Sequence, residues 1–428
     1  MCVYVPMFLY GEKNGTLRPF HGRTIFPHNP FLNPINHGSS LYCIMSDYLN
    51  ISDFLSPVNF NEISQDEGYR DGQIGQAISV YKSLKYPAKK FPELDDAQIV
   101  IVGCGEQRGS GLIHGQSEAP DLVRRQLYSL YYWHKDVKLA DIGNIMAGSL
   151  YTDSYAALKT VVHELVNDGK TVIILGGSHD LTLAQYGAYV ENEKAIEASC
   201  VDALIDLTID SPFRHENFLM EMLTSEPNYI RHYNHIAFQS FYVHPQMLET
   251  MDKLRFDCYR VGTVKETIEE MEPVIRNSSL FSFDISALAH AYAPANSVSP
   301  NGLNGEEACV LMRYAGMSPN VNSIGIYGFD SAHDKDELTA KQVAHMIWYV
   351  LDGRSRGRKE VELDQRDSFN EYHIAFAEVE TTFLQSKKTG RWWMQLPDKN
   401  FIACSYKDYL LASSNEIPER WLRAQERN

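Results

Sequence analysis

From residue 96 onward, short and almost continuously apolar runs alternate with stretches in which apolar residues recur every three or four positions. The runs predict strands that are buried on both faces, and the stretches predict amphipathic helices. We expect strands at residues 98–104, 137–142, 171–175, 203–209, 235–243, 257–262, 280–288 and 323–329. We expect helices at residues 121–132, 154–168, 181–193, 264–275, 306–314 and 341–351. This alternation predicts one large α/β domain, in which helices cover both faces of a parallel sheet of eight strands.

The regions on either side of this domain differ from it in composition. Residues 1–44 are rich in Pro, Gly, Asn and His and show no periodicity, so they are either an extension or lie upstream of the true start at Met45. Residues 45–95 lead into the domain at residues 96–353, and the Gly/Arg-rich residues 352–359 are expected to form an exposed loop. Residues 354–428 are expected to pack on the domain as a C-terminal extension.

Charge and cysteine usage exclude several classes of function. The chain has 428 residues, and its 39 Lys and Arg against 55 Asp and Glu give a net charge of −16. This balance argues against a general nucleic-acid binder and against a polybasic membrane anchor. Seven scattered cysteines without a C-x-x-C pair argue against a thiolate zinc site and a disulfide framework. Without an apolar run of about 20 residues or a secretory signal, we expect a cytoplasmic protein.

Two tryptophans in the C-terminal region, within residues 386–397, lie among basic residues. Aromatic side chains between basic ones stack on nucleobases in some proteins. The acidic net charge and the absence of any further basic stripe favour a packed terminal hairpin instead.

Polar residues follow or interrupt three of the expected strands. His179 comes after the strand at 171–175 and a Gly-Gly-Ser turn, Asp206 and Asp210 lie in the run at 203–209 and just after it, and Asp284 lies in the run at 280–288. A single aspartate of this kind is typical of a helix cap or a structural hydrogen bond. Together, at the ligand-binding edge of one parallel sheet, these side chains form an N/O ligand set for a divalent ion such as Mn²⁺.

The order of these motifs resembles the ureohydrolase superfamily of arginases, agmatinases and formimidoylglutamases. The motifs are Gly-Gly-x-His, Asp-x-x-x-Asp, Ser-Phe-Asp and a Gly-Leu-x-x-x-Glu segment that ends at Glu307. The resemblance covers roughly residues 96–353 and is strongest to the formimidoylglutamase-like branch. It implies a three-layer α/β sandwich with an eight-stranded, mostly parallel sheet, a homo-oligomer and a small cationic amidine as substrate.

The resemblance also implies a metal centre. Enzymes of this superfamily hold two Mn²⁺ ions with a bridging hydroxide that attacks a guanidino or formimino carbon. The expected ligands of the first ion are His179, Asp206, Asp210 and Asp284. Two ligands of the second ion are replaced, because Thr208 stands for the histidine of the motif Asp-Ala-His-x-Asp and Ser286 for an aspartate. A hydroxyl group is a weak ligand, so we expect one Mn²⁺ rather than two.

Three further residues have both a functional and a structural interpretation. Glu307 occupies the position that pairs with the amidinium in the superfamily, and it also suits the first turn of a helix. His215 follows in a loop and is either a proton shuttle or an exposed loop histidine. Arg108 lies in a Gly-rich loop, where it either meets a substrate carboxylate or is solvated. The glycine spacing of that loop does not match the dinucleotide-binding motif G-x-G-x-x-G.

Two hypotheses about function follow. The first is a metal-dependent hydrolase of the C–N bond in a linear amidine, with a site reduced to one ion. The second is a catalytically degenerate relative that serves as a small-molecule sensor or as a subunit interaction module. A nicotinamide-dependent oxidoreductase is a distant third hypothesis, because the glycine spacing argues against it.

Overall fold

A computed structural model describes residues 51–63, 68–83, 89–112 and 116–427 of the chain. These residues belong to a compact unit that runs from Asp47 to Asn428, whereas the expected N-terminal extension at residues 1–44 lies outside the described residues. None of the described helices has the length and apolar character that crossing a membrane requires.

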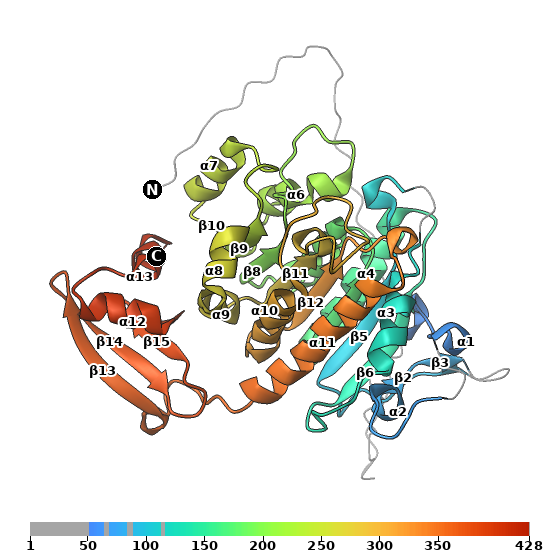
Figure 1. The fold of residues 1–428 in the computed structure, drawn as a ribbon, viewed down its shortest axis with the longest axis horizontal. Helices are drawn as coiled ribbons and strands as arrows, with labels where there is room; N and C mark the ends of the chain where they lie inside the picture. Colours follow the sequence, from blue (N-terminus) through green and yellow to red (C-terminus); the bar gives the residue numbers. More distant parts are fainter. Residues whose placement is uncertain (1–50, 64–67, 84–88, 113–115, 428) are drawn as a thin grey trace, which may run out of the picture. The chain divides into compact units, whose positions relative to one another are not determined.

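A ten-stranded sheet forms the centre of the described unit (Figure 1). Its strands are β1 (Leu55–Ser56), β2 (Ser79–Val80), β5 (Ile99–Cys104), β6 (Leu139–Ile145), β7 (Thr171–Gly176), β8 (Ile196–Val201), β9 (Ile230–Phe238), β10 (Asp257–Arg260), β11 (Leu280–Asp284) and β12 (Ser323–Tyr327). They lie in the order β1-β6-β5-β7-β12-β11-β8-β9-β10, and β2 pairs with β6. The run from β6 to β10 is entirely parallel and has eight strands, the number that the sequence predicts, while the short β1 is antiparallel to β6.

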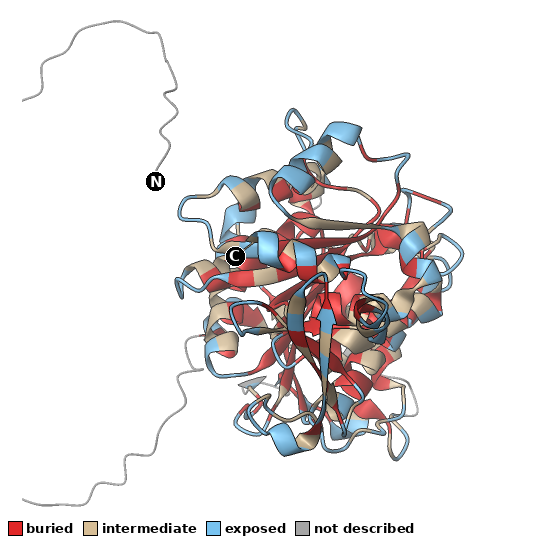
Figure 2. Ribbon diagram, turned by 90° about the vertical axis from the view of Figure 1, so that its left-hand side faces the viewer, coloured by how far each residue is buried: buried red, intermediate tan, exposed pale blue. Residues whose placement is uncertain are grey.

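Helices cover both faces of this sheet, as predicted. They are α1 (Phe60–Ile63), α2 (Ile74–Ala77), α3 (Ala119–Tyr128), α4 (Tyr151–Asn167), α5 (Thr182–Val190), α6 (Phe218–Thr224), α7 (Pro245–Lys253), α8 (Val261–Glu266), α9 (Met271–Arg276), α10 (Gly305–Met317) and α11 (Leu338–Gly357). Alternate residues of β5 face different layers, because Ile101 packs in a cluster with α3, α10 and α11, whereas Val100 packs in a cluster with α4 and α5. Figure 2 shows the buried residues concentrated along the strands.

The position of β8 corrects one prediction. The strand expected at residues 203–209 is a loop, and β8 ends earlier, at Val201. Its sequence Ile-Glu-Ala-Ser-Cys-Val contains small and polar residues and therefore lacks the apolar pattern of a buried strand. The loop that follows is apolar because Ala203, Ile205 and Leu207 are buried against the core. The carboxyl end of β8 therefore lies just before Asp202.

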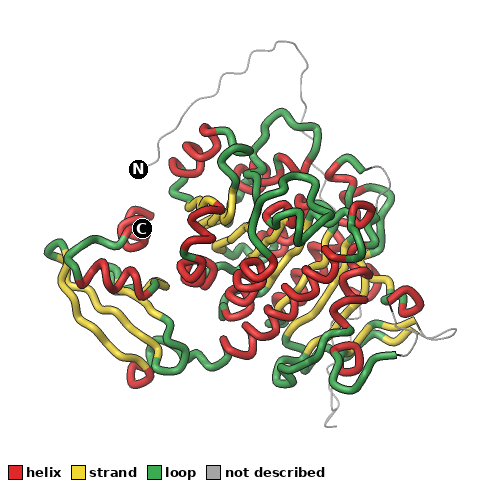
Figure 3. The backbone as a smooth tube through the Cα atoms, in the orientation of Figure 1, coloured by secondary structure: helices red, strands yellow, loops and turns green. Residues whose placement is uncertain are grey.

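The long helix α11 corrects a second prediction. Residues 352–357 continue this helix instead of forming a loop, as Figure 3 shows for the helix that precedes the C-terminal strands. The glycines serve close packing, because a Cβ atom on Gly353 would lie 2.2 Å from the carbonyl oxygen of Arg313, and one on Gly357 would lie 2.4 Å from that of Met317. The glycine pattern therefore marks the place where α11 approaches α10.

This packing makes Gly353→Ala a test of the helix contact. The added methyl group would force the backbones of α10 and α11 apart, so we expect the free energy of unfolding to fall by about 1–3 kcal/mol. Ser355→Ala on the same helix is the control, because Ser355 bonds only to the exposed carboxylate of Asp136. We expect the control to change stability by less than about 0.5 kcal/mol in denaturant titrations. Equal effects of the two substitutions would contradict the close approach.

The C-terminal region forms a four-stranded antiparallel sheet with two helices. Its elements are β13 (Phe369–Phe376), β14 (Val379–Ser386), β15 (Trp392–Gln395), β16 (Phe401–Cys404), α12 (Tyr406–Ser413) and α13 (Glu419–Arg427). Trp392 is buried and stacks on Tyr372, while the buried Trp393 packs against Phe369 and carries the guanidinium of Arg276 on its face. Both tryptophans are therefore packed in the interior and are not free to stack on nucleobases. We call residues 360–427 the C-terminal domain.

Candidate metal centre

The ends of three parallel strands bring a histidine and three aspartates together. Asp284 is the last residue of β11, and Asp202 directly follows the neighbouring strand β8. Asp206 lies in the loop after Asp202, and His179 opens the short helix η4 (His179–Leu181) after β7. Because β12 alone separates β7 from β11, all four side chains meet at the carboxyl edge of the sheet.

The three carboxylates lie around one nitrogen atom of His179. His179 Nδ1 lies 2.9 Å from Asp202 Oδ2, 3.1 Å from Asp206 Oδ2 and 3.7 Å from Asp284 Oδ2. All four residues are buried. Ligand atoms bound about 2.1 Å from a metal at right angles to one another are ~3 Å apart, so the spacing matches neighbouring positions around one ion.

The charges of the cluster also fit a cation. Burial, followed by the charge of Asp202, raises the pKa of Asp206 well above its usual value and that of Asp284 to about 6. Burial opposes ionisation of Asp202 too, but its hydrogen bond to His179 and the charge of that imidazole lower its pKa to about 2. Three carboxylates in a buried space repel one another unless a cation lies between them. One imidazole and three carboxylates are a ligand set that suits Mn²⁺.

Residues behind His179 hold its ring in the orientation that a metal ligand needs. Its Nε2 lies 2.9 Å from the hydroxyl oxygen of Ser282, and that hydroxyl lies 3.0 Å from the hydroxyl of Thr182. Without an ion, Nδ1 carries a proton and donates it to the carboxylates. When Nε2 carries the proton and donates it to Ser282, Nδ1 is unprotonated and its lone pair can bind an ion.

Ser282→Ala tests this orientation. Removing the acceptor frees the tautomer and the ring of His179, so we expect the affinity for Mn²⁺ to fall about 10–100-fold. Competition with a metallochromic indicator measures the change. Ser199→Ala is the control, because Ser199 is equally buried on the neighbouring strand but bonds to Ser278. An unchanged affinity in Ser282→Ala would show that this hydrogen bond does not orient the ligand.

The structure replaces one predicted ligand. Asp210 is exposed in a turn and does not join the cluster, so its prediction as a ligand is wrong, and Asp202 takes that place. The predicted Asp-x-x-x-Asp pair, Asp206 and Asp210, lies four residues beyond the pair in the cluster, because β8 ends earlier than the sequence pattern predicts. A signal was present, since Asp202-Ala203-Leu204-Ile205-Asp206 matches the superfamily motif Asp-Ala-His-x-Asp, including its alanine. Leu204, and not Thr208, therefore stands where the motif has its histidine.

The second oxygens of two carboxylates are already occupied. Asp202 Oδ1 accepts hydrogen bonds from the hydroxyl of Ser286 at 2.6 Å and from the backbone N–H of Leu204 at 3.0 Å. Asp284 Oδ1 accepts one from the backbone N–H of Ser286 at 2.8 Å. These oxygens are therefore satisfied without a second metal ion.

Comparisons with known proteins agree with this geometry. A model of the arginase family matches residues 97–352. The chain belongs to the arginase family. The formimidoylglutamase of Bacillus subtilis (strain 168) is 24% identical over 287 residues, which cover 59% of this chain and 86% of that protein. The formimidoylglutamase of Staphylococcus haemolyticus (strain JCSC1435) is 24% identical over 269 residues, or 58% of this chain and 83% of the relative.

Solved structures show the same fold. The crystal structure of Trypanosoma cruzi formiminoglutamase with Mn²⁺ superposes with a TM-score of 0.56 at 18% identity, over 61% of this chain and 95% of the other. The structure of the B. subtilis formimidoylglutamase gives a TM-score of 0.57 at 19% identity, over 67% and 93%. These findings confirm the predicted resemblance to the formimidoylglutamase-like branch and the arginase-like fold.

In this arginase-family protein, Glu307 has a structural role. It forms a capping box with Asn304 at the start of α10, where its Oε2 accepts the backbone N–H of Asn304 at 2.8 Å. The same oxygen lies 2.8 Å from the ammonium of Lys265. Its role as the partner of an amidinium stays a prediction, and this role requires Lys265 to move.

The other two predicted residues belong to short helices that pack beside η4. His215 belongs to the short helix η5 (Arg214–Glu216), which packs beside η4, and its Nδ1 lies 3.4 Å from the carbonyl oxygen of Gly109. Its role as a proton shuttle stays a prediction. Arg108 forms an ion pair with the buried Glu106 and donates to the carbonyl oxygen of Ser149 at 2.9 Å, so it stabilises its own loop.

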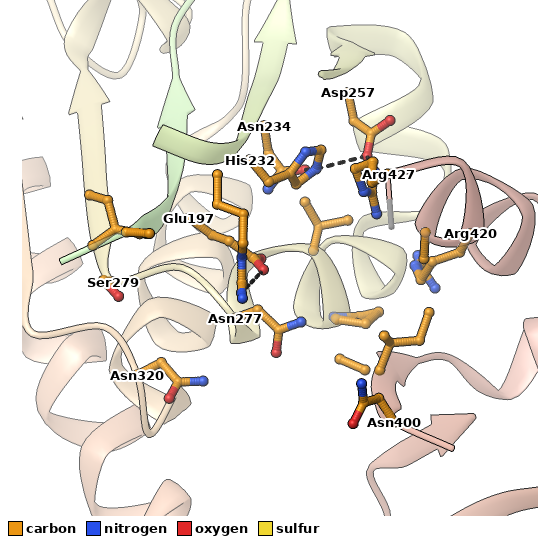
Figure 4. Close-up of a pocket in the computed structure, with 18 of the residues that line it drawn as sticks. Glu197, His232, Asn234, Asp257, Asn277, Ser279, Asn320, Asn400, Arg420 and Arg427 are labelled. Atoms are coloured by element: carbon orange, nitrogen blue, oxygen red, sulfur yellow. Dashed lines mark hydrogen bonds and ion pairs between the residues drawn. The ribbon is translucent and has the colours of Figure 1, made fainter. Parts of the chain in front are cut away.

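A large cavity lies elsewhere in the fold. It has a volume of about 810 Å³ and is lined by residues at the amino ends of β8, β9, β11 and β12 and by the C-terminal domain. Figure 4 shows its polar wall, with His232 and Asn234 near Asp257, Arg427 beside Asp257, and Arg420 further along the C-terminal domain. Because the metal centre lies at the carboxyl ends of the strands, this cavity is a separate feature.

Proposed function

We propose that this arginase-family protein is a hydrolase that cleaves a C–N bond of a linear amidine, a guanidino or formimino compound, with one Mn²⁺ ion. The observation that carries the proposal is the convergence of His179, Asp202, Asp206 and Asp284 on a single position, with all the ligands of the first ion retained. The formimidoylglutamase relatives favour a formimino substrate over a guanidino one.

Each ligand residue has a defined task in this proposal. A bound divalent ion lowers the pKa of a coordinated water and polarises the bond to be cleaved. His179 and the three carboxylates would hold that ion, and Ser282 keeps the Nδ1 lone pair of His179 directed at it. Ser286 fixes the orientation of Asp202 through its hydroxyl and that of Asp284 through its backbone N–H. His215, on the short helix η5 beside η4, is the candidate to accept a proton during turnover.

A non-catalytic role as a metal-dependent small-molecule sensor is the second candidate. It is favoured by Leu204 and Ser286, which replace two ligands of the second ion, and by the ion pair of Glu307 with Lys265. A single ion activates water less than two bridging ions do, which weakens the nucleophile at neutral pH.

Metal content and turnover, measured on the same protein, separate the two candidates. The full chain is loaded with Mn²⁺ and dialysed, and the metal is counted by mass spectrometry. Release of formamide, urea or ammonia is then followed with formiminoglutamate, agmatine, arginine and guanidino acids. We expect one ion per chain and turnover of the formimino substrate. One ion without turnover of any of these compounds would support the sensor, and no ion at all would refute both.

A further inference from the structure

The α/β domain and the C-terminal domain enclose a second site that the metal chemistry does not use. Beside the cavity of about 810 Å³ lies another of about 550 Å³. The two share lining residues, so they form one continuous interdomain cleft. The shared residues are Asn277, Pro319, Asn320 and Phe401. A cleft of this size between two domains is typical of a small-molecule site.

The lining of this interdomain cleft is basic, although the chain as a whole is acidic. Eight lysines and arginines line it, against four aspartates and glutamates. The basic residues are Lys194, Arg231, Arg276, Arg354, Arg358, Arg391, Arg420 and Arg427. Six of the eight form ion pairs with carboxylates, so the positive charge that is left for a bound anion centres on Arg354.

Arg354 has no counter-charge. Among the described residues no carboxylate forms an ion pair with it, and its buried Nε has no hydrogen-bond partner. Arg358 lies one turn further along α11 and lines the same cavity. Burial, and then the charge of Arg358, lower the pKa of Arg354. A half-buried guanidinium beside a like charge is unfavourable unless an anion neutralises it.

Arg391 contributes a second incompletely paired guanidinium to the same cavity. Its side chain is 6% exposed, and one nitrogen, Nη2, donates to the carbonyl oxygen of Met317 at 2.8 Å. Its Nε lies 3.2 Å from the carboxylate of Glu272 and its Nη1 lies 4.0 Å from that of Glu360, but neither buried nitrogen makes a hydrogen bond in these ion pairs. Arg354 and Arg391 therefore both hold N–H groups that lack acceptors.

The larger cavity adds an unpartnered polar group. The ring of His232 is 6% exposed, and its Nε2 lies 3.0 Å from Asp257 and 3.1 Å from the amide oxygen of Asn234. Its Nδ1 is buried and has no partner among the described residues. Figure 4 shows His232 and Asn234 on the wall opposite Arg420. Buried polar atoms normally have a hydrogen-bond partner, so a polar group of a ligand could serve as the partner of this nitrogen.

We propose that the interdomain cleft binds a small molecule with a phosphate or carboxylate group, whose oxyanion is held by Arg354 and Arg391. The remainder of the molecule occupies the polar cavity beside His232. Oxyanions accept paired hydrogen bonds from guanidinium groups, which supplies the acceptors that both arginines lack. Because both domains line the cleft, a bound anion would fasten the C-terminal domain to the α/β domain.

Thermal unfolding of the full chain, loaded with Mn²⁺, tests the proposal. Inorganic phosphate and glutarate serve as probes, each compared with sodium chloride at the same ionic strength. At ~10 times the dissociation constant we expect an anion to raise the unfolding midpoint by about 1–2 °C. The response to each probe distinguishes a phosphate ligand from a carboxylate ligand.

Arg354→Gln is the decisive variant. It removes a guanidinium without an ion pair, so we expect the midpoint in chloride to stay unchanged or to rise, while the response to the anion is lost. Arg356→Gln is the matched control on the same helix, because Arg356 is exposed and pairs with Asp352 instead of lining the cleft. An anion response that survives in Arg354→Gln would overturn the proposal, and so would the absence of any response to phosphate and glutarate in the unchanged chain.

Discussion

Asp202→Ala is expected to abolish stable binding of Mn²⁺. Asp202 provides the carboxylate oxygen nearest to Nδ1 of His179, at 2.9 Å, and it lies between that ring and Ser286. Without Asp202, only His179, Asp206 and Asp284 remain as ligands. We expect the affinity to fall by more than ~100-fold, so that the metal content after dialysis drops from one ion per chain to a small fraction.

Asp210→Ala is the matched control for this experiment. Asp210 lies four residues beyond Asp206, as Asp202 lies four residues before it, but it is exposed. We expect Asp210→Ala to retain the full metal content and the thermal stability of the unchanged protein. Loss of the ion in Asp210→Ala, with retention in Asp202→Ala, would mean that the loop after β8 is arranged differently around the metal.

Restoring the lost ligands is expected to create a second ion site. In the double variant Leu204→His and Ser286→Asp, an imidazole and a carboxylate return to the positions that the family uses for the second ion. Asp202 Oδ1 then loses the hydroxyl of Ser286 and becomes available to bridge two ions, while Asp284 Oδ1 keeps its hydrogen bond from the backbone N–H of residue 286. We expect two ions per chain and, with a better activated water, about a tenfold or greater increase in turnover.

The control for this variant keeps Ser286→Asp but places the histidine at residue 208. Thr208 is exposed, so a histidine there would lie outside the cluster. We expect Thr208→His with Ser286→Asp to bind at most one ion. In the absence of metal, this variant should also be less stable than the unchanged protein, because it adds a buried carboxylate to three others. One ion in both double variants would refute the assignment of Leu204 to the lost histidine position.

Periodicity predicted most of the fold from the sequence. Seven of the eight expected strands overlap strands of the parallel run, because two-sided burial leaves an apolar pattern that is visible in the residues themselves. The pattern does not predict β8, because its buried residues include Ser199 and Cys200, at positions where small side chains are needed. The sequence pattern does not predict the end of α11, because Gly353 and Gly357 are needed for close packing against α10. The local sequence carries no information about that neighbouring helix.

The sequence by itself determined the chemistry of the metal centre: a histidine after a Gly-Gly turn, aspartates at strand ends, and an alternation of strands and helices that directs them to one edge. It did not determine which aspartates meet. Asp202, Asp206 and Asp210 are spaced by four, so the motif fits either pair. Only the packing of β8 between β9 and β11 fixes where that strand ends, and this end places Asp202 against His179 and leaves Asp210 in solvent. The presence of Arg354 and Arg391 in the lining of one cavity is likewise a product of tertiary structure, because residues distant in the chain share a cavity only after both domains have folded.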